Sequence, residues 1–145
     1  MENIYSEPEI KLTQKIIDHL ENIRKWTLFL SIVGFVFVFL MIVIAFFFGY
    51  IMTLFPNETN FQPVTGVFVS VIYVVIGIIH FFPVFYLYRF SIYIKRSLRT
   101  ADTFTMEKAF SSLQTHYAIL GIITALLVGL YVLIILIVAI VALVT

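Results

Sequence analysis

Hydrophobic and polar positions divide this chain into long blocks rather than short periodic segments. Three blocks contain no Asp, Glu, Lys or Arg, and they cover residues 27–55, 64–88 and 117–145. Each is long enough to cross a bilayer as a helix, because about 20 apolar residues span a hydrocarbon core of about 30 Å. The pattern therefore predicts an all-α integral membrane protein with three transmembrane helices in a single domain.

The polar-rich segment before the first block, residues 1–26, carries apolar side chains at helical intervals. Ser6 and Glu9 have the spacing of a capping box, so the segment is predicted to form an amphipathic helix. Two placements stay open, one flat on the membrane surface and one continuous with the first span. We expect its acidic side chains to pair with the basic segment 89–116.

The two connections between the blocks differ in character. Residues 56–63 begin and end with proline and read as a short polar loop. Residues 89–116 continue the helical period, with a turn at Thr100 and Ala101, and Asp102 can cap the next helix. They predict a helical hairpin that extends beyond the bilayer. One face of its second helix is expected to carry Met106, Ala109, Phe110, Leu113 and Tyr117.

Charge sets the expected orientation, because Lys and Arg are retained on the cytoplasmic side of a membrane. All nine Lys and Arg residues lie in segments 1–26 and 89–116. We therefore expect the N-terminus and the hairpin inside the cell, with the 56–63 loop and the C-terminus outside.

The composition argues against a soluble domain, a nucleic-acid-binding surface and a catalytic site. The chain is 62% hydrophobic and only 12% charged, too apolar for a soluble domain, and its net charge of +1 gives no basic surface for nucleic acid. The chain has no Cys and no recognisable catalytic or phosphate-binding motif, so we expect no enzyme, cofactor or metal site. His19 and His116 are expected to be exposed at the interface. Three spans enclose little volume, so the expected partners are the lipid bilayer and either further copies or a larger membrane complex.

A set of residues near one predicted interface resembles a known family. In order, they are Phe85 to Ser91, Lys95, Leu98, Asp102, Ala109, Phe110, Leu113, Tyr117, Gly121 and Ile122. The pattern resembles a family of small uncharacterised bacterial membrane proteins, mainly from Bacteroidetes, catalogued as a domain of unknown function. The resemblance covers about a third of the chain. It implies a bacterial inner-membrane setting and no particular activity.

His80 is the sharpest functional candidate, because an ionisable side chain at membrane depth is costly and often functional. Pro83 follows within one turn and removes the backbone donor to the Ile79 carbonyl. With Ser70 and Tyr73 on the same span, these residues form a candidate intramembrane polar and kink site. The alternative is a neutral His80 that bonds another helix or a water and fixes the kink.

Small and basic residues supply two further candidates. Apolar helices in lipid associate through small side chains, and the candidate packing positions are Gly66, Gly77, Gly121, Ala125 and Gly129. They serve either a seam with another chain or packing among the protein's own helices. The candidate contacts for lipid headgroups are Arg89, Lys95, Arg96 and Arg99. The alternative for these cations is a topology signal alone.

Two functions follow as hypotheses. The first is a non-enzymatic packing, scaffold or accessory subunit that docks through its cytoplasmic helical cluster. The second is a homo-oligomeric channel or carrier for a small solute. Because three apolar spans cannot line a polar path alone, the second requires several copies. Its lining would come from Ser70, Tyr73, His80 and Thr124.

Overall fold

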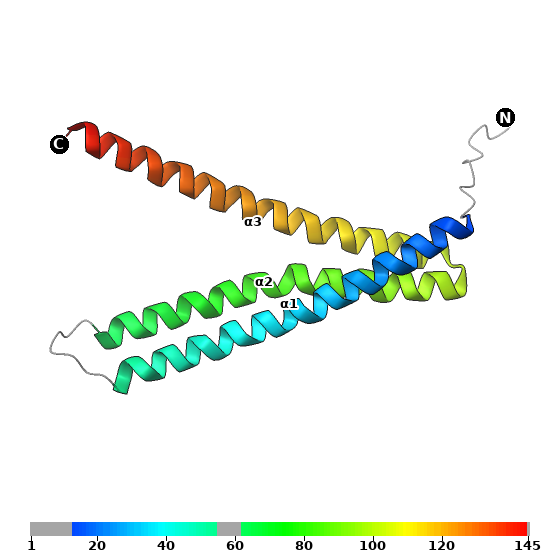
Figure 1. The fold of residues 1–145 in the computed structure, drawn as a ribbon, viewed down its shortest axis with the longest axis horizontal. Coiled ribbons are helices and arrows are strands. Elements are labelled where there is room, and N and C mark those ends of the chain that lie inside the picture. Colours follow the sequence, from blue (N-terminus) through cyan, green and yellow to red (C-terminus); the bar gives the residue numbers. More distant parts are fainter. Residues whose placement is uncertain (1–12, 55–61, 145) are drawn as a thin grey trace, which may run out of the picture.

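The computed structural model describes residues 13–54 and 62–144. Its elements are three long helices, α1 (Gln14–Leu54), α2 (Gln62–Thr100) and α3 (Thr103–Val144). All three are long and apolar enough to cross a membrane. In Figure 1, α1 and α2 lie side by side along their length, whereas α3 leaves α2 at an angle. The predicted all-α, multi-pass membrane architecture is confirmed at this level.

Helix α1 runs without a break from the polar N-terminal segment into the first predicted span. No Gly or Pro interrupts the chain between Gln14 and Gly34, so nothing in this stretch ends the helix. Residues 14–26 therefore do not form a separate surface helix. Leu20 packs against the hydrophobic core, while Ile16 and Ile23 are exposed. The predicted capping pair, Ser6 and Glu9, lies outside the described residues.

Helices α1 and α2 approach closely through glycines. A methyl group built on Gly34 would lie 2.7 Å from a methyl group of Val84, and one built on Gly49 would lie 2.6 Å from the Ser70 hydroxyl. Both distances are too short for real carbon contacts. The absence of a side chain at Gly34 and Gly49 therefore sets how near the two backbones come, as small residues do in other membrane helix pairs.

Hydrogen bonds join the same two helices near both ends. The Ser70 hydroxyl donates to the Ala45 carbonyl at 2.8 Å, and the Ser91 hydroxyl donates to the Arg24 carbonyl at 3.0 Å. These pairs place residue 45 level with residue 70 and residue 24 level with residue 91. They define an antiparallel register for the α1–α2 pair.

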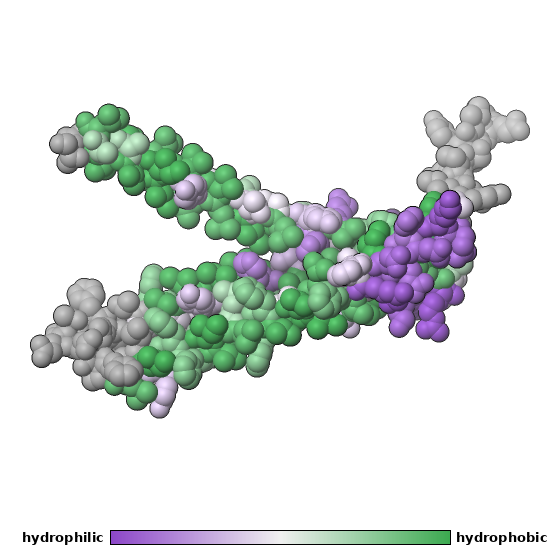
Figure 2. Space-filling view, in the orientation of Figure 1, coloured by the Kyte–Doolittle hydropathy of each residue, from purple (hydrophilic) through white to green (hydrophobic). Residues whose placement is uncertain are grey.

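The hydrophobic core lies at the end where all three helices meet. Phe90, Ile94 and Ala109 are buried there. The side chains packed around them are Leu20, Tyr93, Leu98, Met106 and Leu113. Figure 2 shows that polar residues also gather at this end, while the rest of the visible surface is mainly apolar.

The predicted apolar face at the start of α3 is partly wrong. Phe110 and Tyr117 are exposed, at 48% and 63%, although Ala109 is buried. The side chains that α3 buries instead include the polar Thr105, Ser112 and His116. Close helix approach favours small side chains, and each of these three polar side chains has a hydrogen-bond partner, so its burial leaves no polar group unsatisfied.

Beyond its first four turns, α3 leaves the other helices. Every residue from 124 to 143 is exposed, and no side chain in the most apolar stretch of α3 is buried within the chain. Among the described residues, the α3 backbone comes close to that of α2 but not to that of α1. The membrane half of α3 is therefore free of intramolecular packing (Figure 1).

Candidate functional site

The turn that joins α2 to α3 is built around one carboxylate. Asp102 accepts hydrogen bonds from the backbone N–H groups of Phe104 and Thr105, at 3.1 and 3.2 Å, and from the Thr105 hydroxyl. Ala101 takes a left-handed conformation with φ of 50°, which reverses the chain before the cap. Asp102 thus caps α3 as predicted. The Ser97 hydroxyl fastens the turn to α2 by donating to the Asp102 carbonyl at 3.1 Å.

These bonds also stabilise the charge of the carboxylate. The Thr105 hydroxyl has the largest effect and lowers the pKa of Asp102 below its ordinary value. The backbone N–H groups of Phe104 and Thr105 and the nearby charge of Arg96 act in the same direction, whereas desolvation opposes them. The cap is therefore formed by the ionised side chain.

His116 joins α3 to α2 at the level where the two helices part. Its imidazole is 9% exposed, and its Nδ1 lies 2.7 Å from the Pro83 carbonyl oxygen. Since a carbonyl only accepts, Nδ1 must carry the proton and donate. The expectation that His116 is exposed is wrong. No sequence pattern indicates this burial, because the partner is a backbone atom 33 residues away.

His80 bonds within its own helix. Its Nδ1 lies 3.1 Å from the Ile76 carbonyl oxygen, one turn earlier in α2. The Pro83 carbonyl is taken by His116, and the Ser70 hydroxyl points to α1. Tyr73 is 37% exposed. The hydrogen bonds of the candidate polar and kink site therefore go to α1, to α2 itself and to α3, and do not converge on one site. Helix α2 remains helical through Pro83.

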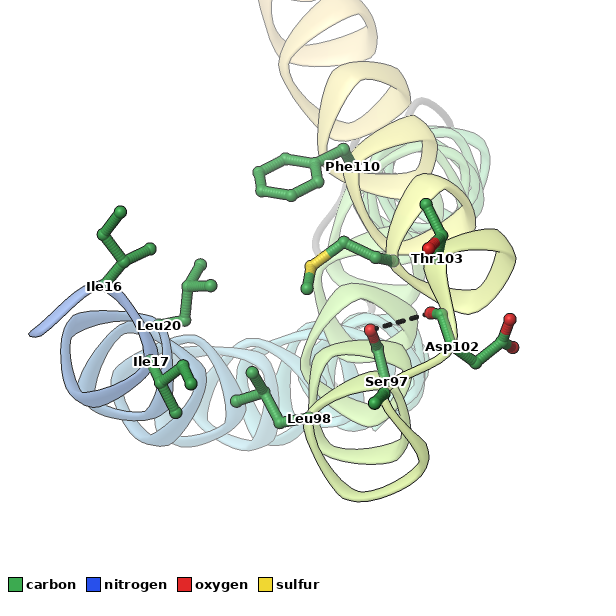
Figure 3. Close-up of a pocket in the computed structure, with 10 residues that line it drawn as sticks. Ile16, Ile17, Leu20, Ser97, Leu98, Asp102, Thr103 and Phe110 are labelled. Carbon is green, nitrogen blue, oxygen red and sulfur yellow. Dashed lines mark hydrogen bonds between the residues drawn. The ribbon is translucent and has the colours of Figure 1, made fainter. Parts of the chain in front are cut away.

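A groove opens between the start of α1 and the α2–α3 turn (Figure 3). It encloses about 490 Å³ and is lined mainly by apolar side chains. Figure 3 shows Ile16 and Leu20 of α1 facing Leu98 and Phe110 across it. The described residues that line it include no paired nucleophile and base. The groove suits an apolar group.

The four candidate lipid-binding cations fall into two sets. The Arg89 guanidinium donates to the Tyr93 hydroxyl at 2.9 Å and lies 5.3 Å from the centre of that ring. Lys95, Arg96 and Arg99 are all exposed and line an open groove of about 500 Å³ with Ile92 and Thr100. Arg89 is thus held by an aromatic neighbour, and the other three share one surface.

Acidic side chains on α1 pair within their own helix. Glu21 lies 3.6 Å from Arg24 and 3.9 Å from Lys25. Asp18 accepts a hydrogen bond from Gln14 at 3.2 Å. Across residues 13–54 and 62–144, no ion pair joins an acid of α1 to a cation of α2 or α3, contrary to the expected pairing. The remaining N-terminal acids, Glu2, Glu7 and Glu9, lie outside the described residues.

The small residues divide by helix. Gly66 and Gly77 of α2 are buried, and a methyl group on Gly77 would lie 3.5 Å from Ile42 of α1. Gly121, Ala125 and Gly129 of α3 are exposed. A methyl group on Gly121 or Gly129 would meet nothing within 4 Å. Gly34, which the sequence analysis did not single out, has one of the two tightest contacts.

Known proteins add no further assignment. Comparison with models of known protein families, with curated proteins and with solved structures finds no match for this chain. Among the described residues, no three His, Cys, Asp or Glu side chains gather in a way that could hold a metal ion. The described residues form helix contacts, a helix cap and a basic surface.

Proposed function

We propose that the protein is a non-enzymatic accessory subunit of a larger membrane complex, and that α3 packs against a transmembrane helix of another membrane protein. The observation that carries the proposal is the pair Gly121 and Gly129, which have nothing within 4 Å of an added methyl group. In the α1–α2 pair, Gly34 and Gly49 occupy tight helix contacts. Glycines at helical spacing on α3 offer the same kind of surface without a partner.

The main contact is placed on α3 rather than on the helical cluster that the sequence favoured. In that cluster, the hydroxyls of Ser91 and Ser97 and the imidazole of His116 already bond to backbone atoms of this chain. These groups stabilise the junction, which leaves the apolar groove as its available surface. The free half of α3 is the larger apolar face.

A homo-oligomeric channel or carrier is the second candidate, and the geometry favours it less. The Ser70 hydroxyl bonds to α1 and the Nδ1 of His80 bonds within α2, so these two groups are already used within this chain. Thr124 is exposed on α3, which diverges from both helices. A polar path would have to be built from other groups.

We also propose that the end carrying the cations faces the cytoplasm of a bacterium, with the protein in the inner membrane. Support comes from the gathering of polar residues at the α2–α3 turn and the start of α1 (Figure 2). Retention of Lys and Arg on the cytoplasmic side then places Thr145 outside.

The experiment that tests the subunit proposal is gentle extraction of the complex from native membranes at natural expression, followed by its mass and composition. We expect a second membrane protein in the complex. Replacing Gly121 and Gly129 together by Leu should remove it, because the bulky side chains prevent close approach. A complex that contains only this chain would reject the proposal and favour the oligomeric channel.

A matched control keeps the added bulk on α3 but moves it to another face. At about 100° per residue, Val138 and Ala142 lie well away from the line through Gly121 and Gly129. The combined change Val138→Phe and Ala142→Leu should leave the second protein bound. Equal loss in both double variants would mean that α3 is sensitive to bulk at any position and would contradict a seam along the glycines.

A further inference from the structure

One exposed face of α2 carries three cations near its end. Ile92, Lys95, Arg96 and Arg99 follow helical spacing, so they lie along one side of the helix. The other side of the same stretch buries Phe90, Ile94 and Ser97 against α1 and α3. The face that carries Lys95, Arg96 and Arg99, called the basic face below, is therefore turned away from the core and open to the surroundings.

The charge on the basic face is not neutralised by the described part of the chain. Among residues 13–54 and 62–144, no carboxylate lies within 4.0 Å of Lys95, Arg96 or Arg99. Glu21 is paired with Arg24 and Lys25, and the Asp102 carboxylate is bonded to the turn. Arg96 also acts on the charge of Asp102, but that carboxylate forms no ion pair with it, so the three cations still attract an anion from outside.

The position of the basic face along α2 fits the headgroup layer of a bilayer. Ser91 is level with Arg24, and the exposed Trp26 and Tyr88 nearby are typical of a membrane interface. Lys95 lies about 6 Å and Arg99 about 12 Å further along the helix than Ser91. The polar layer of a bilayer is about 5 to 7 Å thick on each side.

The direction of the side chains shortens the distance between the charged groups of the basic face and the headgroup layer. In an α-helix, each Cα–Cβ bond tilts toward the N-terminus of the helix. The N-terminal part of α2 is its membrane-spanning part, so Lys95, Arg96 and Arg99 lean back toward the bilayer. Their long aliphatic stems allow the charged groups to reach headgroup phosphates from outside the hydrocarbon.

We propose that the basic face is a binding site for the phosphate of an anionic phospholipid. Guanidinium groups bind phosphate oxygens in pairs, which suits Arg96 and Arg99, and the Lys95 ammonium adds a point charge. Ile92, which is 41% exposed at the membrane side of the groove, contacts the glycerol and upper acyl region of the same lipid. The site does not depend on the identity of any protein partner.

The test is titration of a fluorescent phosphatidylglycerol into the full chain held in neutral detergent, with fluorescent phosphatidylcholine as reference. The variant K95Q/R96Q/R99Q should bind phosphatidylglycerol about tenfold more weakly and phosphatidylcholine unchanged. The control K15Q/K25Q/K108Q removes the same charge from exposed positions elsewhere and should retain the affinity for phosphatidylglycerol. Circular dichroism verifies the fold of both variants, and R99Q alone, with a smaller expected loss, replaces the triple variant if that fails to fold.

Three outcomes would overturn the proposal. Equal weakening in the two triple variants would mean a general effect of net charge. Unchanged binding in K95Q/R96Q/R99Q would mean that phosphatidylglycerol binds elsewhere. Displacement of the labelled lipid by millimolar inorganic phosphate, with saturable phosphate binding in the absence of lipid, would mean a site for free phosphate. Weakening confined to the α2 variant and resistance to inorganic phosphate support the lipid site.

Discussion

At the scale of single residues, buried polar side chains of this protein bond mainly to backbone atoms, and His116 joins α3 to α2 in this way. Removing the imidazole leaves the Pro83 carbonyl without this donor at a buried position. We expect His116→Ala to lower the free energy of unfolding by about 1 to 3 kcal/mol. The measurement is thermal or denaturant unfolding in detergent.

The control for this change is His19→Ala, because His19 is exposed at the start of α1. It should alter stability by less than about 0.5 kcal/mol. An equal effect of the two substitutions would contradict a structural role for the bond between His116 and Pro83.

Gly34 provides a second test at this scale. A methyl group at this position would clash with Val84, so Gly34→Ala should destabilise the α1–α2 pair by about 1 to 3 kcal/mol. Adding Val84→Ala should restore part of the loss. Gly121→Ala is the matched control, since its methyl group would meet nothing within 4 Å. The free energy of unfolding in detergent is measured for all three variants. An equal loss of stability in Gly34→Ala and Gly121→Ala would rule out the close contact.

Asp102 gives a pH dependence with a definite sign. Its pKa is lowered in the folded protein, so the ionised cap contributes stability at neutral pH. That contribution should remain above the ordinary pKa of 3.8 and disappear as the pH falls through the lower, folded value. Asp102→Asn should flatten this part of the stability profile. A wild-type profile that matches the variant at acid pH and at neutral pH would contradict the role of the carboxylate.

These residues also show where sequence analysis succeeds and where it stops. Asp102 was predictable as a cap, because capping depends on neighbours within the same turn. His116 and Gly34 were not, because their partners lie on another helix and are a carbonyl and a valine without any pattern of their own. Partners of this kind become visible only when the register between helices is known.

At the scale of elements, the three charge-free blocks predicted the spanning helices, since length and apolarity decide that property. The buried face of α3 was not predictable in the same way. Ala109 was expected on the face and is buried, but Phe110 was also expected there and is exposed. Hydrophobicity alone does not select this packed face, which carries the small or hydroxyl-bearing residues Thr105, Ala109 and Ser112.

The free half of α3 leads to a prediction for spin-labelled single-cysteine variants. The chain contains no Cys of its own, so only the introduced residue takes the label. A spin label at Leu126 or Ile134 should collide readily with oxygen dissolved in the bilayer. A label at Ala45, which is fully buried between α1 and α2, should be protected. Similar accessibility at Ala45 and Leu126 in the purified chain would contradict the splayed arrangement of α3.

At the scale of the whole molecule, the proposed orientation is open to a direct test. Alkaline phosphatase, which is active only outside the cytoplasm, should be active when fused after Thr145 and inactive when fused after Thr100. The positions of Lys and Arg support this result. The reverse pattern of activities would invert the proposed topology and place the basic face in the outer leaflet.

The way α3 is held has a mechanical consequence. Among the described residues, α3 is held mainly by α2, through a junction that ends near His116, and the helix then continues for about 42 Å to Val144. A rotation of α3 by about 5° at this junction therefore displaces its far end, at Val144, by about 4 Å. The chain itself does not set how wide the molecule is at the far side. That width is determined by whatever occupies the membrane beside α3.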